Sequence, residues 1–120
     1  MKLIISGSRS FSDYAFMCEM IQRVNDNVDE ITEVVFGGQK GAEILGKQWA
    51  DENGIKIKPM LQNKSRDGEN AIKIRNKAMC EYADAALLFW DGESPGTKNM
   101  IQILKISEKP HHVTGIGEQL

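Results

Sequence analysis

The fold of this chain is indicated most clearly by residues 34–43, Val34-Val35-Phe36-Gly37-Gly38-Gln39-Lys40-Gly41-Ala42-Glu43. An apolar run ends in two glycines, a third glycine follows after two further residues, and an amphipathic segment then begins. This order is typical of a β-strand, a tight turn and the start of a helix. Backbone N–H groups at such a helix start attract anions, above all phosphate, and glycine lets the backbone approach a ligand closely because it has no Cβ. The three glycines can equally serve a tight turn alone.

The same order of strand, turn and helix occurs twice more. A short apolar run at residues 2–5 leads into the small-residue loop 6–10, which contains Arg9 and is either a solvated turn or a second anion site. The most apolar run, residues 84–90, leads into the turn 91–97. The sequence predicts strands at residues 2–5, 32–36, 55–60, 84–90 and 111–116, and helices at residues 13–25, 41–53, 69–82 and 97–108, with a polar loop at 63–68 and a frayed tail at 115–120.

Alternating strands and helices predict one α/β domain over residues 1–120, with a Rossmann-like, mostly parallel sheet of about five strands and helices on both faces. The run 84–90 should be central and covered on both faces. The alternating segment 55–60 should be near an edge of the sheet. In such sheets ligands bind at the carboxyl ends of the strands, so the three turns should meet at one rim.

Composition narrows the range of functions that are expected. The chain has 120 residues, with 15 basic and 17 acidic side chains, and a formal net charge of -2, so a broad electrostatic nucleic-acid surface is not expected. Cys18 and Cys80 are expected to be buried free thiols in a reducing compartment. His111-His112 stands without a metal-ligand motif, and we expect no metal and no cofactor. Without an apolar run of about 20 residues or a signal segment, we expect a cytoplasmic protein and no membrane partner.

Four motifs together resemble those of a known group of proteins. They are Ser6-Gly7-Ser8-Arg9, Gly37-Gly38-Gln39-Lys40-Gly41-Ala42, Arg75-Asn76-Lys77-Ala78-Met79, and Phe89-Trp90-Asp91-Gly92 through Pro95-Gly96-Thr97. Their order resembles the SLOG superfamily, and within it the small YspA-like (DUF2493) branch, which is related to the LOG phosphoribohydrolases and the DprA/Smf proteins. The resemblance covers about residues 2–110. It implies a Rossmann-like fold that binds nucleotides or nucleotide-derived ligands, including NAD- and ADP-ribose-type signals.

The resemblance also assigns residues to the site. It implies ligand contacts from three turns and one helix, namely Gly7, Ser8, Arg9, Gly37, Gly38, Gly41, Arg75, Asn76, Gly96 and Thr97. Two departures concern catalysis. At the last turn the pattern of the LOG enzymes is Pro-Gly-Gly-X-Gly-Thr-X-X-Glu. This chain has a shorter glycine run there, and Met100 stands where those enzymes have the glutamate carboxylate. Glu43 stands where the YspA-like branch commonly has aspartate.

The residues leave three functions open. The first is a binding module for a small nucleotide-like ligand, acting as a sensor or a sequestering protein. Arg9, Arg75 and Lys40 would neutralise phosphate, and Asn76, Asp91 or Glu43 would hydrogen-bond the base or ribose. Arg75 can instead lie on a solvated helix face or pair with a carboxylate. Trp90 can stack on a base, although capping of the core is the more ordinary role for it.

The second function is a nucleotide N-glycosidase or phosphoribohydrolase. Cleavage of an N-glycosidic bond needs a carboxylate to stabilise an oxocarbenium-like state or to activate water. Glu43 is the first candidate catalytic residue, and Asp91 and Glu93 also lie on the expected rim. Alternatively, Glu43 has no catalytic role and is an acidic residue in the first turn of the helix, where the helix dipole favours it. The third function is a nucleic-acid binder of the DprA kind, against which the near-neutral charge argues. We also expect a homodimer or higher homo-oligomer, because the helices carry more apolar residues than one small sheet needs.

Overall fold

A computed structural model describes residues 1–116 of the chain. Strands and helices alternate along it as the sequence predicts. The strands are β1 (Lys2–Gly7), β2 (Glu33–Phe36), β3 (Lys56–Pro59), β4 (Ala85–Trp90) and β5 (His111–Gly115). The helices are α1 (Tyr14–Asn27), α2 (Ala42–Glu52), α3 (Lys64–Asp67), a 3-10 turn η1 (Gly68–Asn70), α4 (Ala71–Tyr82) and α5 (Pro95–Ile106).

The five strands form one parallel sheet in the order β3-β2-β1-β4-β5. The chain winds outward from β1 to β3, returns to place β4 on the other side of β1, and ends with β5 at the opposite edge. The strand order therefore reverses between β1 and β4. In an open α/β sheet this reversal opens a crevice at the carboxyl ends of the strands, which is where ligands bind. The Rossmann-like fold class is confirmed, and the sheet is wholly parallel among the described strands.

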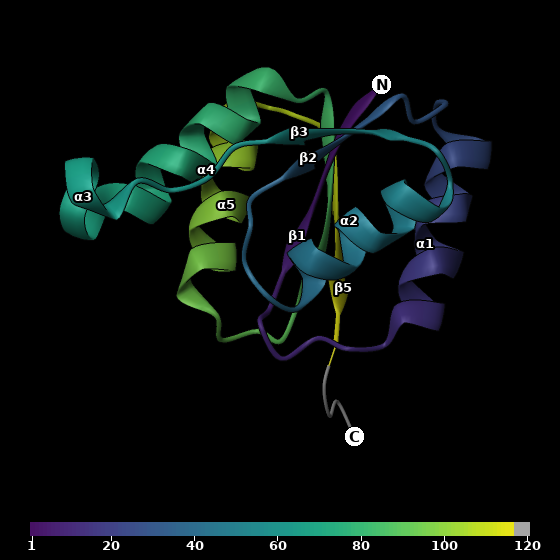
Figure 1. Cartoon of the computed structure of the whole chain (residues 1–120), viewed down its shortest axis with the longest axis horizontal. Coiled ribbons are helices and arrows are strands. Elements are labelled where there is room, and N and C mark those ends of the chain that lie inside the picture. Colours follow the sequence, from purple (N-terminus) through teal and green to yellow (C-terminus); the bar gives the residue numbers. More distant parts are fainter. Residues whose placement is uncertain (117–120) are drawn as a thin grey trace.

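Helices cover both faces of the sheet, as Figure 1 shows with the sheet seen nearly edge-on between them. Helices α1 and α2 pack on one face around a core that includes Leu3, Ile5, Met17 and Phe89. Helices α4 and α5 pack on the other face around a second core that includes Met79, Leu88 and Met100. The inner strands β1 and β4 are buried on both sides because their residues face these two cores in alternation.

The prediction of a polar loop at residues 63–68 is wrong. These residues form α3 and the start of η1, and helix α4 begins at Ala71 rather than at residue 69. The side chain of Asn63 accepts a hydrogen bond from the N–H of Arg66 at 3.1 Å, which caps the first turn of α3. Helix α3 stands away from the two packed layers (Figure 1), so tertiary burial does not explain it and the local cap does.

Three smaller predictions are also wrong. Helical spacing of apolar residues predicts Ile74 on the apolar face of the helix at 69–82 and Ile106 on that of the helix at 97–108, yet these residues are 44% and 84% exposed. In α4 the buried face passes through Arg75 and Asn76 instead. Thr97 is a residue type that can cap the last helix, but α5 begins at Pro95 and Ser94 is its N-cap. The expected tail overlaps β5 at residue 115, and residues 117–120 lie outside the described part.

Two further findings concern the cysteines and the lengths of the helices. Cys18 and Cys80 are both free thiols, as expected. Cys80 is buried, but Cys18 is partly exposed, so the expectation of burial is wrong for Cys18. Burial raises the pKa of the Cys80 thiol to about 11. Over the described residues 1–116, no helix has both the length and the apolar character that a membrane crossing requires.

Candidate functional site

A pocket of about 460 Å³ lies at the carboxyl ends of the strands, where the order of the sheet reverses. The turn after β1 forms one side of it, and the turn after β4 with the start of α5 forms another. Gln39 reaches it from the turn after β2, and Ile72 from α4. The lining residues are Gly7, Arg9, Ser10, Gln39, Ile72, Asp91, Ser94, Pro95, Gly96 and Thr97. The prediction that turns from several strands meet at one rim is thus realised in the geometry.

The N-terminus of α5 opens onto this pocket without a side-chain cap. Ser94 is the N-cap, but its hydroxyl makes no capping bond to the helix, and Pro95 has no N–H to offer. The N–H groups of Gly96 and Thr97 belong to the first helical turn, where a helix supplies no carbonyl partner. Both residues line the pocket. Unsatisfied N–H groups and the positive end of the helix dipole make this end of the pocket suited to an anion.

Arg9 is the cation on the pocket wall. Its side chain is exposed, and it forms no ion pair or side-chain hydrogen bond within the described part of the chain. Lys40, the other basic residue predicted near the glycine turn, is exposed but does not line the pocket. The guanidinium of Arg9 is therefore available to a ligand, whereas the ammonium of Lys40 lies outside the pocket wall.

Asp91 organises the turn between β4 and α5. Its Oδ1 accepts hydrogen bonds from the N–H groups of Glu93 and Ser94, both at 2.8 Å. The Ser94 hydroxyl lies 3.0 Å from both carboxylate oxygens and 3.0 Å from the Ser8 hydroxyl. The backbone N–H bonds from Ser94 and Glu93 lower the pKa of Asp91 to about 2. This carboxylate is ionised at neutral pH and holds the turn in place.

The charge of Asp91 is expected to make stability depend on pH. Because its folded pKa is depressed from the usual value of about 4, its contribution is fully present above about pH 5 and is lost as pH falls from 4 towards 2. Asp91→Asn should therefore lower the free energy of unfolding at pH 7 by about 1 kcal/mol relative to wild type. Thermal unfolding at pH 7, 4 and 2 should show the two proteins converging at the lowest pH. A gap that stays constant would contradict this role of the charge.

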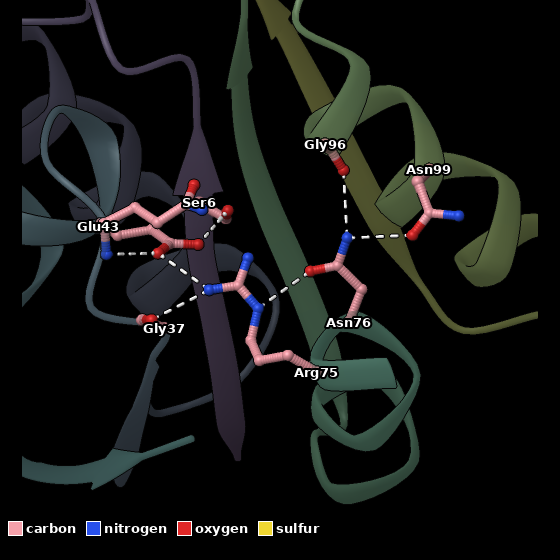
Figure 2. Close-up of polar contacts among 8 residues, drawn as sticks. Ser6, Gly37, Glu43, Arg75, Asn76, Gly96 and Asn99 are labelled. Carbon is pink, nitrogen blue, oxygen red and sulfur yellow. Dashed lines mark hydrogen bonds and ion pairs between the residues drawn. The ribbon is translucent and has the colours of Figure 1, made fainter. Parts of the chain in front are cut away.

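Beneath the pocket, a buried network joins four elements, and Figure 2 shows it with Arg75 at its centre. The Nη1 of Arg75 donates to the Gly37 carbonyl at 2.9 Å and lies 3.3 Å from Glu43 Oε1. The Ser6 hydroxyl donates to Glu43 Oε2 at 2.6 Å, and the Gln39 N–H donates to Glu43 Oε1 at 2.9 Å. Side chains of Arg75 and Glu43 are only 4% and 1% exposed. Of the three roles that the sequence left open for Arg75, the structure shows the ion pair with a carboxylate, that of Glu43.

The network continues towards α5 through Asn76. Arg75 Nε donates to Asn76 Oδ1 at 3.1 Å, and Asn76 Nδ2 donates to the Gly96 carbonyl at 3.1 Å and to Asn99 Oδ1 at 3.0 Å (Figure 2). One chain of hydrogen bonds thus connects the glycine turn, α4 and the first turn of α5. These side chains hold the walls of the pocket in register and do not line it.

The glycines of the central turn pack against the protein itself. Gly41 has φ +83°, and a Cβ there would lie 2.4 Å from the Ser8 carbonyl oxygen. A Cβ at Gly37 would lie 2.2 Å from Arg75 Nη1. The glycines therefore allow this turn to pack closely against the turn after β1 and against the buried ion pair. Within the described chain, the side of the pocket next to this turn is formed by Gln39 alone.

The predicted site residues fall into two groups. Those that line the pocket are Gly7, Arg9, Asp91, Gly96 and Thr97. Those that lie behind or beside it are Ser8, Gly37, Gly38, Lys40, Gly41, Glu43, Arg75 and Asn76. Trp90 is partly buried against the core of α4 and α5, and its Nε1 donates to the Ser94 carbonyl at 3.1 Å. Sequence reasoning missed Ser10, Gln39, Ile72, Ser94 and Pro95, although all but Ile72 stand in the turns that it singled out.

Among residues 1–116, no group of three or more His, Cys, Asp or Glu side chains is placed to hold a metal ion.

Comparison with known proteins gives one result. The family model YAcAr, which describes the YspA, cpYpsA-related SLOG family, matches residues 1–62. The match covers β1 to β3 with the glycine turn, and the motifs of α4 and α5 lie beyond it. No curated protein and no solved structure gives a significant match.

Proposed function

Because the chain belongs to the YspA, cpYpsA-related SLOG family, we propose that it binds a nucleoside phosphate or an ADP-ribose-type ligand in the pocket at the carboxyl ends of the strands. Membership of this family points to a nucleotide-related function. The chain would act as a sensor subunit or by sequestering its ligand. The homo-oligomer expected from the sequence stays a prediction, and the exposed Ile74 and Ile106 on α4 and α5 agree with it.

One observation carries the proposal. The uncapped N-terminus of α5 and the guanidinium of Arg9, which has no ion-pair partner among residues 1–116, line the same pocket from turns that follow different strands. Backbone N–H groups and a guanidinium together provide the hydrogen-bond donors and positive charge that a phosphate requires. A volume of about 460 Å³ falls within the range of small-molecule sites.

The carboxylates favour binding over hydrolysis. Glu43 is buried, accepts hydrogen bonds from Ser6 and Gln39, and pairs with Arg75, so it does not line the pocket where an anomeric carbon would lie. Asp91 does line the pocket, but its pKa of about 2 leaves it ionised at neutral pH. An ionised carboxylate cannot protonate a leaving base, so a hydrolase built on Asp91 would need another acid.

A retention experiment tests the function. The protein is incubated with AMP, NAD, ADP-ribose and cyclic ADP-ribose, separated from free ligand and heat-denatured, and the released molecules are identified by chromatography. We expect an intact nucleotide. If free base or ribose phosphate is recovered instead, and Asp91→Asn or Glu43→Gln abolishes its release, the protein is a hydrolase and not a binding module. Failure to retain any of the four would contradict the proposal.

Arg9→Ala should weaken binding of the retained nucleotide by about 1.5–3 kcal/mol, roughly 10- to 150-fold, because a charge-assisted hydrogen bond is lost. The exposure of Arg9 predicts little change in unfolding temperature. Lys40→Ala is the matched control, since it removes a neighbouring positive charge that does not line the pocket. Isothermal titration calorimetry measures both. Equal affinities for wild type and Arg9→Ala would remove Arg9 from the site.

A further inference from the structure

The amide of Gln39 is the unexplained polar group of the pocket. The residue forms part of the pocket wall, yet its Nε2 is buried and has no hydrogen-bond acceptor among residues 1–116. A buried donor without an acceptor destabilises the free protein, because it has lost its bond to water and gained nothing in return. Neither the glycine motif nor the family match assigns a role to this side chain.

The backbone of Gln39 is held more firmly than a turn residue requires. Its N–H donates to Glu43 Oε1 at 2.9 Å, and that carboxylate is itself fixed by Ser6 and Arg75. The flanking Gly38 has φ +88°, and Gly41 packs on the Ser8 carbonyl. The buried ion pair thus fixes the point from which the Gln39 side chain extends, while its Nε2 has no acceptor among the described residues.

The position of Gln39 in the sheet indicates which part of a ligand it meets. It follows β2, whereas the N-terminus of α5 follows β4, and β1 lies between these two strands. Two strand spacings separate them, about 10 Å at the rim. A phosphate bound by α5 and Arg9 therefore leaves the nucleoside part of the ligand facing Gln39.

We propose that Gln39 is the specificity-determining residue of the pocket, and that its amide turns towards the bound ligand and donates a hydrogen bond to an uncharged acceptor on the ribose or base. This inference rests on the proposed function and deepens it. The ligand class that follows is a nucleoside phosphate recognised at both ends, by cationic and backbone donors at the phosphate and by a neutral amide at the nucleoside. Glu43 and Arg75 act as positioning residues for that amide.

Gln39→Met tests the inference because it keeps the length of the side chain and removes the amide. We expect affinity for whichever of AMP, NAD, ADP-ribose and cyclic ADP-ribose the wild type retains to fall about 3- to 10-fold, which corresponds to one neutral hydrogen bond. Affinity for inorganic phosphate, measured by competition, should not change. The melting temperature of the free protein should stay the same or rise by up to about 4 °C, because an unpaired donor has been removed. Lys40→Ala should leave all three quantities unaltered.

The other outcomes separate two failures. If the wild type binds a nucleotide and Gln39→Met binds it equally well, the inference is wrong and the proposed function stands. If Gln39→Met lowers the melting temperature and weakens phosphate and nucleotide alike, the amide has a structural role and the inference is again wrong. If the wild type retains none of the nucleotides, the proposed function fails, and the role of Gln39 fails with it.

Discussion

Arg75→Met is expected to lower the free energy of unfolding by about 3–5 kcal/mol, the cost of leaving one charge of a buried pair without its partner. The side chain of Glu43 is 1% exposed, so water cannot replace the guanidinium that lies 3.3 Å from its Oε1. The Gly37 carbonyl would lose its donor as well. A loss of this size is a large fraction of the total stability of a small domain. Urea denaturation followed by circular dichroism measures it.

Two matched variants separate the ion pair from general disturbance. Glu43→Leu/Arg75→Met removes both charges, so it should lose clearly less than the sum of the two single variants. Lys47→Ala breaks the exposed ion pair with Asp51 and should change stability by less than about 0.5 kcal/mol. If Arg75→Met unfolds like the Lys47 variant but loses nucleotide affinity, Arg75 is a ligand residue, as the resemblance implied, and the buried network is not what holds the pocket.

Gly41→Ala is expected to lose about 2–5 kcal/mol, because strain at a positive φ adds to overpacking against the backbone. Gly41 has φ +83° and ψ −130°, a conformation in which only glycine is unstrained, and the added Cβ would lie 2.4 Å from the Ser8 carbonyl oxygen. That oxygen also accepts the Ala42 N–H at 3.3 Å, so the two turns cannot separate without losing the start of α2. Thermal and urea unfolding both report the loss.

Gly96→Ala is the control for this prediction. It also changes a glycine in a turn of the pocket, but the nearest atom to its Cβ would be Ile72 Cγ2 at 3.7 Å, an ordinary contact. Gly96 lies in the first turn of α5, where alanine should cost nothing and can add up to about 1 kcal/mol. Similar losses for the two variants would mean that the packing of the turns is not what requires glycine at position 41.

Much of the candidate site could be located from the sequence, but which residues line the pocket and which lie behind it could not. Small residues after three apolar runs placed Gly7, Arg9, Asp91, Gly96 and Thr97 at the rim, and all five line the pocket. Helical periodicity alone put Ile74 on the buried side of α4 and left the environment of Arg75 open. The orientation of α4 is set by its packing on β1 and α5, and this turns Arg75 and Asn76 inward.

Local sequence patterns were enough to predict the parallel α/β sheet, the covered central strands and the rim at which the turns meet. These follow from local patterns, since alternating apolar runs and helices leave few other ways to bury both elements. Packing of distant segments was needed to place the glycine turn against Ser8 and the ion pair, and to bring the start of α5 and Arg9 to the same pocket. These contacts join residues that are far apart along the chain. Glu43 and Arg75 are 32 residues apart, and Asn76 and Gly96 are 20 residues apart. Such pairs meet only when strands and helices pack, and no local periodicity encodes which side chains will then find each other.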